Sequence, residues 1–441
     1  MSDTFNGGVH PDDGKALSKD TPVSDYTPTG ELAYPLSQHI GAPAAAIVKK
    51  GDRVLRGQKI AEAAGFVSAH IYAGASGTVK GIEKRRTPVG DMADCIIIEN
   101  DGAMECVPGL GERQTDPKEL SREDIINRVK EAGVVGMGGA GFPNHVKLSP
   151  KEPDKIEYVI ANCAECEPYL TSDYRMMLER PECIIGGLKI ALSLFENAKG
   201  IIAIEDNKPD CIELMRELTT GESRITVKSL ETKYPQGSER QLIYACTGRA
   251  INSKMLPADA GCIVDNADTL IAIYEAVTKE IPLIDRIVTV TGDAVADPKN
   301  FRVPIGTDLS ELLEAAGGFK CTPEKVICGG PMMGFALFDL HVPITKTCSS
   351  LLGLREDTVS KTKSTACINC GECVRACPSR LIPTRLAAAA DHGDEEGFES
   401  CFGLECMECG SCSYVCPAKR HLAQSIKTMR KIILGKKKNG K

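Results

Sequence analysis

The sequence lacks the features of a chain that crosses a membrane by itself. No apolar run approaches the ~18–20 residues that a membrane-spanning helix needs. The first residues, Met1 to Gly8, contain neither a basic segment nor an apolar one, so we expect no signal peptide. Tryptophan is absent, and the formal net charge of −7 gives no general reason to expect binding to nucleic acid. The 441 residues are enough for roughly three domains of ~150 residues each.

Cysteine, in contrast, is abundant, with 20 residues in the chain. The pattern C-x2-C-x2-C-x3-C, followed by proline, is written twice: Cys367, Cys370, Cys373 and Cys377, then Cys406, Cys409, Cys412 and Cys416. This spacing is typical of bacterial ferredoxins, in which the fourth cysteine of each run binds the cluster of the other run. The proline turns the chain away after the last cysteine.

The repeated pattern predicts two [4Fe–4S] clusters. One would be bound by Cys367, Cys370, Cys373 and Cys416, and the other by Cys406, Cys409, Cys412 and Cys377. Two zinc ribbons are the alternative, but zinc sites usually pair two C-x2-C units across a gap. A disulfide framework is a further alternative. The remaining cysteines are scattered, and we expect them to be buried free thiols, which together with clusters fits the cytoplasm.

The pattern of hydrophobic residues predicts a multidomain protein of the α/β and α+β classes. Residues 1–30 are rich in glycine, proline and aspartate and are expected to form an extended arm. Residues 31–112 contain short apolar runs broken by glycine, which predicts a small β barrel or sandwich. Within it, Val48 to Ile60 resembles the hammerhead turn of biotinyl/lipoyl-type domains, and we expect a packing role for this turn.

Residues 113–282 alternate between helix and strand patterns, which predicts an α/β domain with a mainly parallel sheet and ligands at the strand ends. Residues 283–345 have a strand–helix–strand pattern typical of a β-grasp (SLBB-like) domain. Residues 346–425 hold the two cysteine runs and are expected to form a helical, ferredoxin-like domain. Residues 426–441 form a basic tail, which either contacts an anionic membrane surface or acidic partner or is simply solvated.

A glycine-rich segment lies inside the predicted α/β domain. Gly136, Gly138, Gly139 and Gly141 let backbone amides approach a phosphate, and Lys147 can supply a full positive charge. A plain turn is the alternative. The spacing G-x-G-x-x-G is present, but no strand of the usual length precedes it, so the sequence does not predict a standard Rossmann site.

Several segments together resemble a known family. Gly136 to Lys147 resembles the flavin loop of the NADH-binding subunit of respiratory complex I. Asn162 to Thr171 with Asp173, Tyr234 to Glu239 and Gly329 to Gly334 resemble the C subunit of the Rnf ion-translocating electron transport complex. The resemblance includes Gly7 to Pro11, the barrel segment and both cysteine runs. Two ferredoxin runs favour Rnf over complex I, whose subunit has one cluster with a different cysteine pattern.

The resemblance implies a noncovalent FMN on the glycine loop, with NAD(H) as substrate stacked over it. The amides of the four glycines would face the flavin phosphate, Lys147 would pair with it, and Asn162 and Asp173 would bond the flavin. Phe142 would pack against the nicotinamide or adenine, and Glu165 and Glu167 would bond ribose or flavin. The implied residues outside the loop and its lysine are Phe142, Asn162, Glu165, Glu167 and Asp173.

The family also implies an activity and partners. The chain would exchange electrons between ferredoxin and NAD(H) at the cytoplasmic face of a membrane complex that moves Na⁺ or H⁺. Its partners would be the other Rnf subunits, including membrane subunits and the ferredoxin-like cluster subunit. An RnfC-like cobalamin reductase, a diaphorase subunit of a hydrogenase or formate dehydrogenase, and a cluster-only electron relay without a nucleotide site are the alternatives.

Overall fold

Short strands separated by glycine build the N-terminal unit of the computed structural model, which describes residues 3–439. One antiparallel sheet has the order β2-β8-β7-β4 and a second has the order β3-β5-β6. Leu32, Ile60 and Ile96 are fully buried in the core of this unit. Its strands are β2 (Leu32–Pro35), β3 (Ala45–Ala46), β4 (Arg53–Val54), β5 (Lys59–Glu62), β6 (Ile71–Tyr72), β7 (Gly77–Arg86) and β8 (Met92–Asn100). The prediction of a barrel or sandwich here is confirmed.

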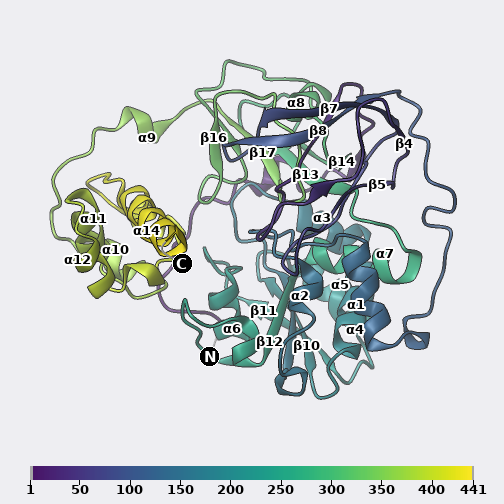
Figure 1. Cartoon of the computed structure of the whole chain (residues 1–441). Coiled ribbons are helices and arrows are strands. Elements are labelled where there is room, and N and C mark those ends of the chain that lie inside the picture. The colour runs from purple at the N-terminus through teal and green to yellow at the C-terminus, as the bar shows by residue number, and fades with distance from the viewer. Residues whose placement is uncertain (1–2, 440–441) are drawn as a thin grey trace.

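A parallel sheet of order β11-β10-β9-β12 forms the centre of the next unit (Figure 1). Its strands are β9 (Tyr158–Cys163), β10 (Lys199–Glu205), β11 (Ile225–Leu230) and β12 (Cys262–Asn266). The helices are α1 (Arg122–Glu131), α2 (Asn144–Lys147), α3 (Ser172–Glu179), α4 (Pro181–Ser193), α5 (Pro209–Leu218), α6 (Glu239–Thr247) and α7 (Ala267–Lys279). The predicted α/β domain with a mainly parallel sheet is therefore present.

Both faces of this sheet are covered, which explains why its central strand β10 is almost continuously apolar. Ile201 and Ala203 of β10 pack in one core cluster with Leu242 of α6. Ile202 and Ile204 point to the opposite face and join the cluster that contains residues of α1, α4, α5 and α7. The period of two along the strand thus divides its side chains between the two helical layers.

The third unit is a six-stranded sheet of order β1-β14-β13-β17-β15-β16, with α8 (Leu309–Ala315) packed in its core. Most of its strands come from the predicted β-grasp region: β13 (Asp285–Thr291), β14 (Lys299–Pro304), β15 (Lys325–Cys328) and β16 (Phe335–Leu337). Two lie outside it, because β1 (Ser24–Asp25) pairs in parallel with β14 and β17 (Ser350–Leu354) lies between β13 and β15.

The C-terminal helices lie to one side of the other units and are reached through α9 (Thr358–Lys361) (Figure 1). They are α10 (Glu372–Arg375), α11 (Pro383–Asp391), α12 (Glu395–Ser400), α13 (Ser411–Tyr414) and α14 (Leu422–Asn439). Residues 426–439, expected as a basic tail, continue α14 instead. Leu422, Ile426, Met429 and Ile433 recur on one face of this helix and are buried, which holds it against the domain.

Within residues 3–439, no helix is both long enough and apolar enough to cross a membrane.

Candidate functional site

The glycine loop leads from α1 towards the one-turn helix α2 and opens into a large cleft. The residue before the loop, Val135, makes only an isolated bridge to Pro143, so no strand precedes the glycines. Gly141 has a φ of +69°, and a Cβ there would lie 2.9 Å from Cγ2 of Thr347. At Gly138 a Cβ would lie 2.9 Å from Cβ of Asn266. The loop therefore needs glycine at these two positions, either for space or for backbone conformation.

The cleft bordered by this loop, here called the glycine-loop cleft, has a volume of about 1750 Å³. All four glycines, Phe142, Lys147 and Asn162 line it, together with Gly237, Ser238, Glu239 and Asn266. Asn266 is the last residue of β12 and Asn162 the next-to-last residue of the neighbouring parallel strand β9, and their Cα atoms are paired in register. The cleft thus lies at the carboxyl ends of β9 and β12, where ligands bind in open α/β sheets.

The wall of the cleft holds an ion pair between Lys147 and Asp265. Lys147 Nζ lies 3.2 Å from Oδ1 of Asp265 and donates to the carbonyl oxygen of Val264 (2.6 Å). Burial by itself would lower the pKa of Lys147, but the negative charges of Asp265 and Glu239 outweigh it and the pKa is raised. Lys147 is therefore held as an ammonium, and one of its three N–H donors has no partner among residues 3–439.

The amides of the loop are not equivalent. Gly136 N donates to the carbonyl oxygen of Phe142 (2.9 Å), and Met137 N donates to Oγ1 of Thr269 (2.9 Å). The amides of Gly138, Gly139 and Gly141 have no acceptor among the described residues. We expected the Gly136 amide to face a ligand, but in the structure it bonds the carbonyl oxygen of Phe142 within the loop.

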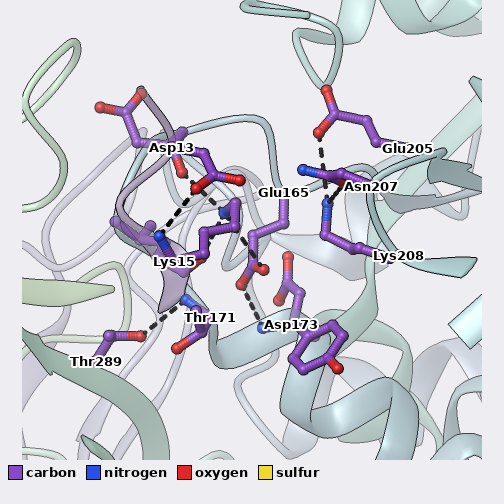
Figure 2. Close-up of polar contacts among 12 residues, drawn as sticks. Asp13, Lys15, Glu165, Thr171, Asp173, Glu205, Asn207, Lys208 and Thr289 are labelled. Carbon is purple, nitrogen blue, oxygen red and sulfur yellow. Dashed lines mark hydrogen bonds and ion pairs between the residues drawn. The ribbon is translucent and has the colours of Figure 1, made fainter. Parts of the chain in front are cut away.

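The acidic residues Glu165, Glu167 and Asp173 do not line the glycine-loop cleft. Glu165 is buried between Lys15 Nζ (3.6 Å from Oε2) and the amide of Asp173, which donates to its Oε1 (2.7 Å; Figure 2). Glu167 Oε1 accepts from the amides of Met332 (2.8 Å) and Met333 (3.2 Å).

Burial raises the pKa of Glu167 to about 7, against the opposing effect of these amides. Asp173 Oδ2 accepts from Nδ2 of Asn266 (2.7 Å), so Asp173 supports a residue of the cleft without reaching it. Burial, and next the charge of Glu165, raise the pKa of Asp173 well above its ordinary value. The three carboxyl groups thus accept hydrogen bonds from neighbouring segments beside the cleft.

Sequence reasoning did not select Glu239 or Asn266 as site residues. Glu239 opens α6, directly after its N-cap Ser238, and Asn266 is the N-cap of α7, where its side chain accepts from the amide of Asp268. Asn162 and Gly237 are joined by a hydrogen bond from Asn162 Nδ2 to the Gly237 carbonyl (2.8 Å). The sequence pattern that could have identified Asn266 is a strand that ends in a polar residue at the start of a helix.

The eight cysteines of the two runs line two cavities. The first, here called the distal cavity, is lined by Cys367, Cys370, Cys373 and Cys416, and the second, the proximal cavity, by Cys406, Cys409, Cys412 and Cys377. Each cavity therefore takes three thiols from one run and the last thiol of the other. The donor set of four thiols around one cavity fits a [4Fe–4S] cluster.

The backbone around these thiols repeats between the two runs. The amide of Asn369 donates to Sγ of Cys367, and the amide of Glu408 donates to Sγ of Cys406, each at 3.4 Å. Both donors have positive φ angles, +57° and +59°. Burial raises the pKa of the Cys406 thiol to about 11 and that of Cys412 to about 12.

The proximal cavity faces the α/β unit. Oη of Tyr234 donates to the carbonyl oxygen of Cys409 (2.7 Å), and Nε2 of Gln241 donates to that of Pro378 (3.0 Å). Arg240 pairs with Glu405 (3.2 Å), one residue before Cys406. The helix α6 therefore begins in the wall of the glycine-loop cleft and holds the cysteine domain with its next two residues.

Relatives of known name match almost the whole chain. The C subunit of a proton-translocating ferredoxin:NAD(+) oxidoreductase complex from Clostridium ljungdahlii is 46% identical over 88% of this chain and 84% of its own. The sodium-translocating counterpart from Acetobacterium woodii is 41% identical over 99% of this chain and 98% of its own. This chain belongs to the RnfC family. The C subunit of an ion-translocating oxidoreductase complex from Rhodobacter capsulatus is 39% identical over 90% of this chain and 77% of its own.

Four domain families match in the order of the units. The RnfC barrel sandwich hybrid domain matches residues 3–103, and the Nuo51 FMN-binding domain matches residues 129–275. The SLBB domain matches residues 287–336, and a 4Fe-4S dicluster domain matches residues 366–420. The RnfC-family chain thus carries an FMN-binding domain and a 4Fe-4S dicluster domain, as the sequence predicted.

Proposed function

We propose that this RnfC-family chain exchanges electrons between NAD(H) and ferredoxin within an ion-translocating membrane complex. FMN bound in the glycine-loop cleft would convert a two-electron hydride transfer into the single-electron steps that clusters carry. The observation that carries the proposal is the continuity of α6, in which Glu239 lines the cleft and Gln241 contacts Pro378 beside the proximal cavity.

The walls of the cleft offer a binding site for two ligands at once. A single small-molecule pocket usually has ~300–1,000 Å³, whereas this cleft has about 1750 Å³. The amides of Gly138, Gly139 and Gly141, with the ammonium of Lys147, would hold the flavin phosphate. Phe142 and Asn162 would contact the flavin or the nicotinamide.

The lining of the cleft mixes both signs of charge: the basic Lys151, Lys155, Arg249 and Lys254 lie among the acidic Glu152, Asp154, Glu157 and Asp259. Arg249 pairs with Glu157 (2.7 Å) and Lys155 with Glu152 (2.6 Å). Lys151 and Lys254, which also line the cleft, have no carboxylate partner among residues 3–439. These two lysines would bind the phosphates of NAD(H).

The cysteine domain would hold two [4Fe–4S] clusters with crossed ligands. Cys377, Cys406, Cys409 and Cys412 would bind the cluster beside the α/β unit, and Cys367, Cys370, Cys373 and Cys416 the cluster farther along. Cys370 is exposed, and the side chain of Ile368 is 66% exposed, so the second cluster would lie near the surface. Electrons would pass there to or from another Rnf subunit.

We also propose a location for the chain in the cell. It would bind at the cytoplasmic face of the membrane, as a peripheral subunit next to membrane subunits and a ferredoxin-like cluster subunit. Lys427, Lys436 and Lys437 of α14 pair with Glu408, Glu395 and Glu399. The exposed Lys431 would face an anionic membrane or an acidic partner.

Anaerobic purification followed by measurement of iron, acid-labile sulfide and flavin tests the proposal. We expect about eight iron atoms and one FMN per chain, and bleaching of the visible spectrum on addition of NADH. Eight irons without flavin, or a flavin that NADH does not reduce, would leave a cluster-only relay. Reduction of cobalamin by NADH without any reaction with ferredoxin would favour the cobalamin reductase instead.

A further inference from the structure

The N-terminal arm joins the flavin unit to the cysteine domain. Asp3 forms a parallel bridge with Leu230 at the end of β11, and Val9 forms an antiparallel bridge with Tyr234. Between them, Gly8 N donates to the carbonyl oxygen of Ala376 (2.9 Å), the residue before Cys377. The arm thus bonds on one side to the sheet of the α/β unit and on the other to the backbone of a cluster-binding run.

The backbones of the two units approach the arm so closely at Gly7 and Gly8 that only glycine fits there. A Cβ at Gly7 would lie 2.8 Å from the carbonyl oxygen of Cys377, and one at Gly8 would lie 2.7 Å from that of Tyr234. Both glycines have positive φ angles, +84° and +83°. The obstacles are backbone atoms of two different units, so a side chain at either position would push these units apart.

A small apolar cluster fills the same junction. Val9, Tyr234 and Ala376 are buried together, with Met332 and Cys409 packed against them. Tyr234 also bonds the Cys409 carbonyl through its hydroxyl group. Tyr234, three residues from Gly237 in the wall of the cleft, therefore contacts both the arm and the wall of the proximal cavity, beside the direct contacts that α6 makes with the cysteine domain.

Lys15 anchors the far end of the arm. Its ammonium group is buried and donates to the carbonyl oxygens of Glu167 (3.1 Å) and Leu170, and it lies 3.6 Å from Oε2 of Glu165 (Figure 2). The amide of Lys15 donates to Asp13 Oδ1 (3.1 Å), which shapes the turn before the anchor. Removing this cation would leave Glu165 near only one other buried ammonium, Lys208.

We propose that the segment Asp3 to Lys15 is a strap that sets the separation of the flavin site and the proximal cluster, with Gly7 and Gly8 as positioning residues. This inference rests on the proposed function. The rate of electron tunnelling falls steeply with distance, so a displacement of the cysteine domain slows transfer from flavin to cluster. Hydride transfer from NADH to flavin takes place inside the cleft and does not depend on that separation.

The variant Gly7→Ala, compared with Gly90→Ala in the anaerobically purified full chain, tests the strap. Gly90 has a similar positive φ, +91°, but no atom lies within 4 Å of a Cβ placed there, so it carries the backbone strain without the clash. We expect Gly7→Ala to keep the wild-type rate of flavin reduction by NADH and to reduce the clusters several-fold more slowly. We expect Gly90→Ala to match the wild type in both rates.

Amide hydrogen exchange supplies a second measurement that needs neither flavin nor NADH. We expect faster exchange in peptides covering residues 3–15 and 372–381 of Gly7→Ala, and no such change in Gly90→Ala. Equal cluster reduction and equal exchange in the two variants would overturn the strap. A wild-type chain that fails to bind flavin would overturn the proposed function instead, while the exchange comparison still decides whether the arm holds the junction.

A milder pair covers the case in which Gly7→Ala does not fold. Val9→Ala removes buried apolar contacts at the junction, and Val54→Ala removes a similar side chain from the core of the β-sandwich unit. Slower cluster reduction in Val9→Ala alone supports the strap. The same rates in both variants would contradict it.

Discussion

The ammonium of Lys147 lies 3.2 Å from the carboxylate of Asp265, inside the wall of the glycine-loop cleft. Asp265 also accepts from Nδ2 of Asn144 (2.7 Å), on the short helix that carries Lys147. The pair therefore fixes the position of a cation that still has one N–H donor for a ligand.

Replacement of Lys147 by methionine is expected to weaken FMN binding by about 2 kcal/mol, roughly 30-fold, since a charged hydrogen bond to the phosphate is lost. The single change also leaves the buried Asp265 without its cation, which destabilises the fold. The double variant Lys147→Met with Asp265→Asn restores stability and keeps the weak binding. Titration of the flavin-free chain with FMN, followed by flavin fluorescence, measures this. Wild-type affinity in the double variant would exclude a phosphate contact.

Gly138 and Gly139 are expected to respond differently to alanine. A Cβ at Gly138 meets Cβ of Asn266 at 2.9 Å, whereas at Gly139 no atom lies within 4 Å. Overpacking should cost Gly138→Ala about 1–3 kcal/mol of stability, seen as a lower unfolding temperature. Gly139→Ala should keep the wild-type unfolding temperature but bind FMN less tightly, because its methyl group enters the cleft. Equal losses of stability would contradict this geometry.

The crossed cluster ligands predict a pattern of iron loss in double variants. Cys377 and Cys406 line one cavity, so Cys377→Ser and Cys377→Ser with Cys406→Ser should each lose one cluster and keep about four iron atoms. Cys377→Ser with Cys367→Ser should lose both clusters, because Cys367 lines the other cavity. Iron and sulfide analysis of the anaerobic proteins gives the answer. If each run instead bound its own cluster, the two double variants would exchange results.

Lys346 should make the stability of the chain depend on pH in the alkaline range. Its ammonium is fully buried and donates to the carbonyl oxygens of His70 and Gly133 (2.7 Å to the latter), and burial lowers its pKa to about 7. Between pH 8 and 10 the unfolded lysine binds a proton that the folded lysine does not. The free energy of unfolding therefore rises with pH in this window, by about 1.4 kcal/mol per pH unit.

Lys346→Met should lack this slope. Urea unfolding of both proteins at pH 8, 9 and 10, followed by circular dichroism because the chain has no tryptophan, provides the comparison. The wild type should gain stability over the variant as the pH rises. Parallel curves would show that Lys346 keeps its ordinary pKa in the folded chain.

Much of the fold can be predicted from local sequence patterns. The period of two in β10, the capping of α1 by Ser121 and Asp124, and the cysteine spacing each depend on residues that are near one another in sequence. The lysines of residues 426–441 predict a basic tail, whereas the structure continues α14 to residue 439 through Leu422, Ile426, Met429 and Ile433. Their spacing places them on one helical face, so hydrophobic burial decides the structure there.

The candidate site could be predicted only in part from the sequence. Seven of the ten predicted cofactor residues line the cleft, because the glycine loop and the end of β9 are contiguous segments. Glu165, Glu167 and Asp173 do not line it, because their positions depend on Lys15, Met332 and Asn266, which are distant in sequence. No local sequence pattern predicts hydrogen-bond or ion-pair partners that are so distant in the chain.

By itself, the sequence determined the chemistry of this protein. Thiols at fixed spacing predict clusters, glycines beside a lysine predict a phosphate loop, and alternating strands and helices predict a parallel sheet, since each pattern follows from short-range geometry. Only the tertiary structure decided which groups meet. It paired Asn162 with Asn266, placed Cys377 with the second run and inserted the arm at Gly7 and Gly8 between two units. Such contacts depend on the packing of many weakly interacting side chains, which is fixed only when the whole chain has folded.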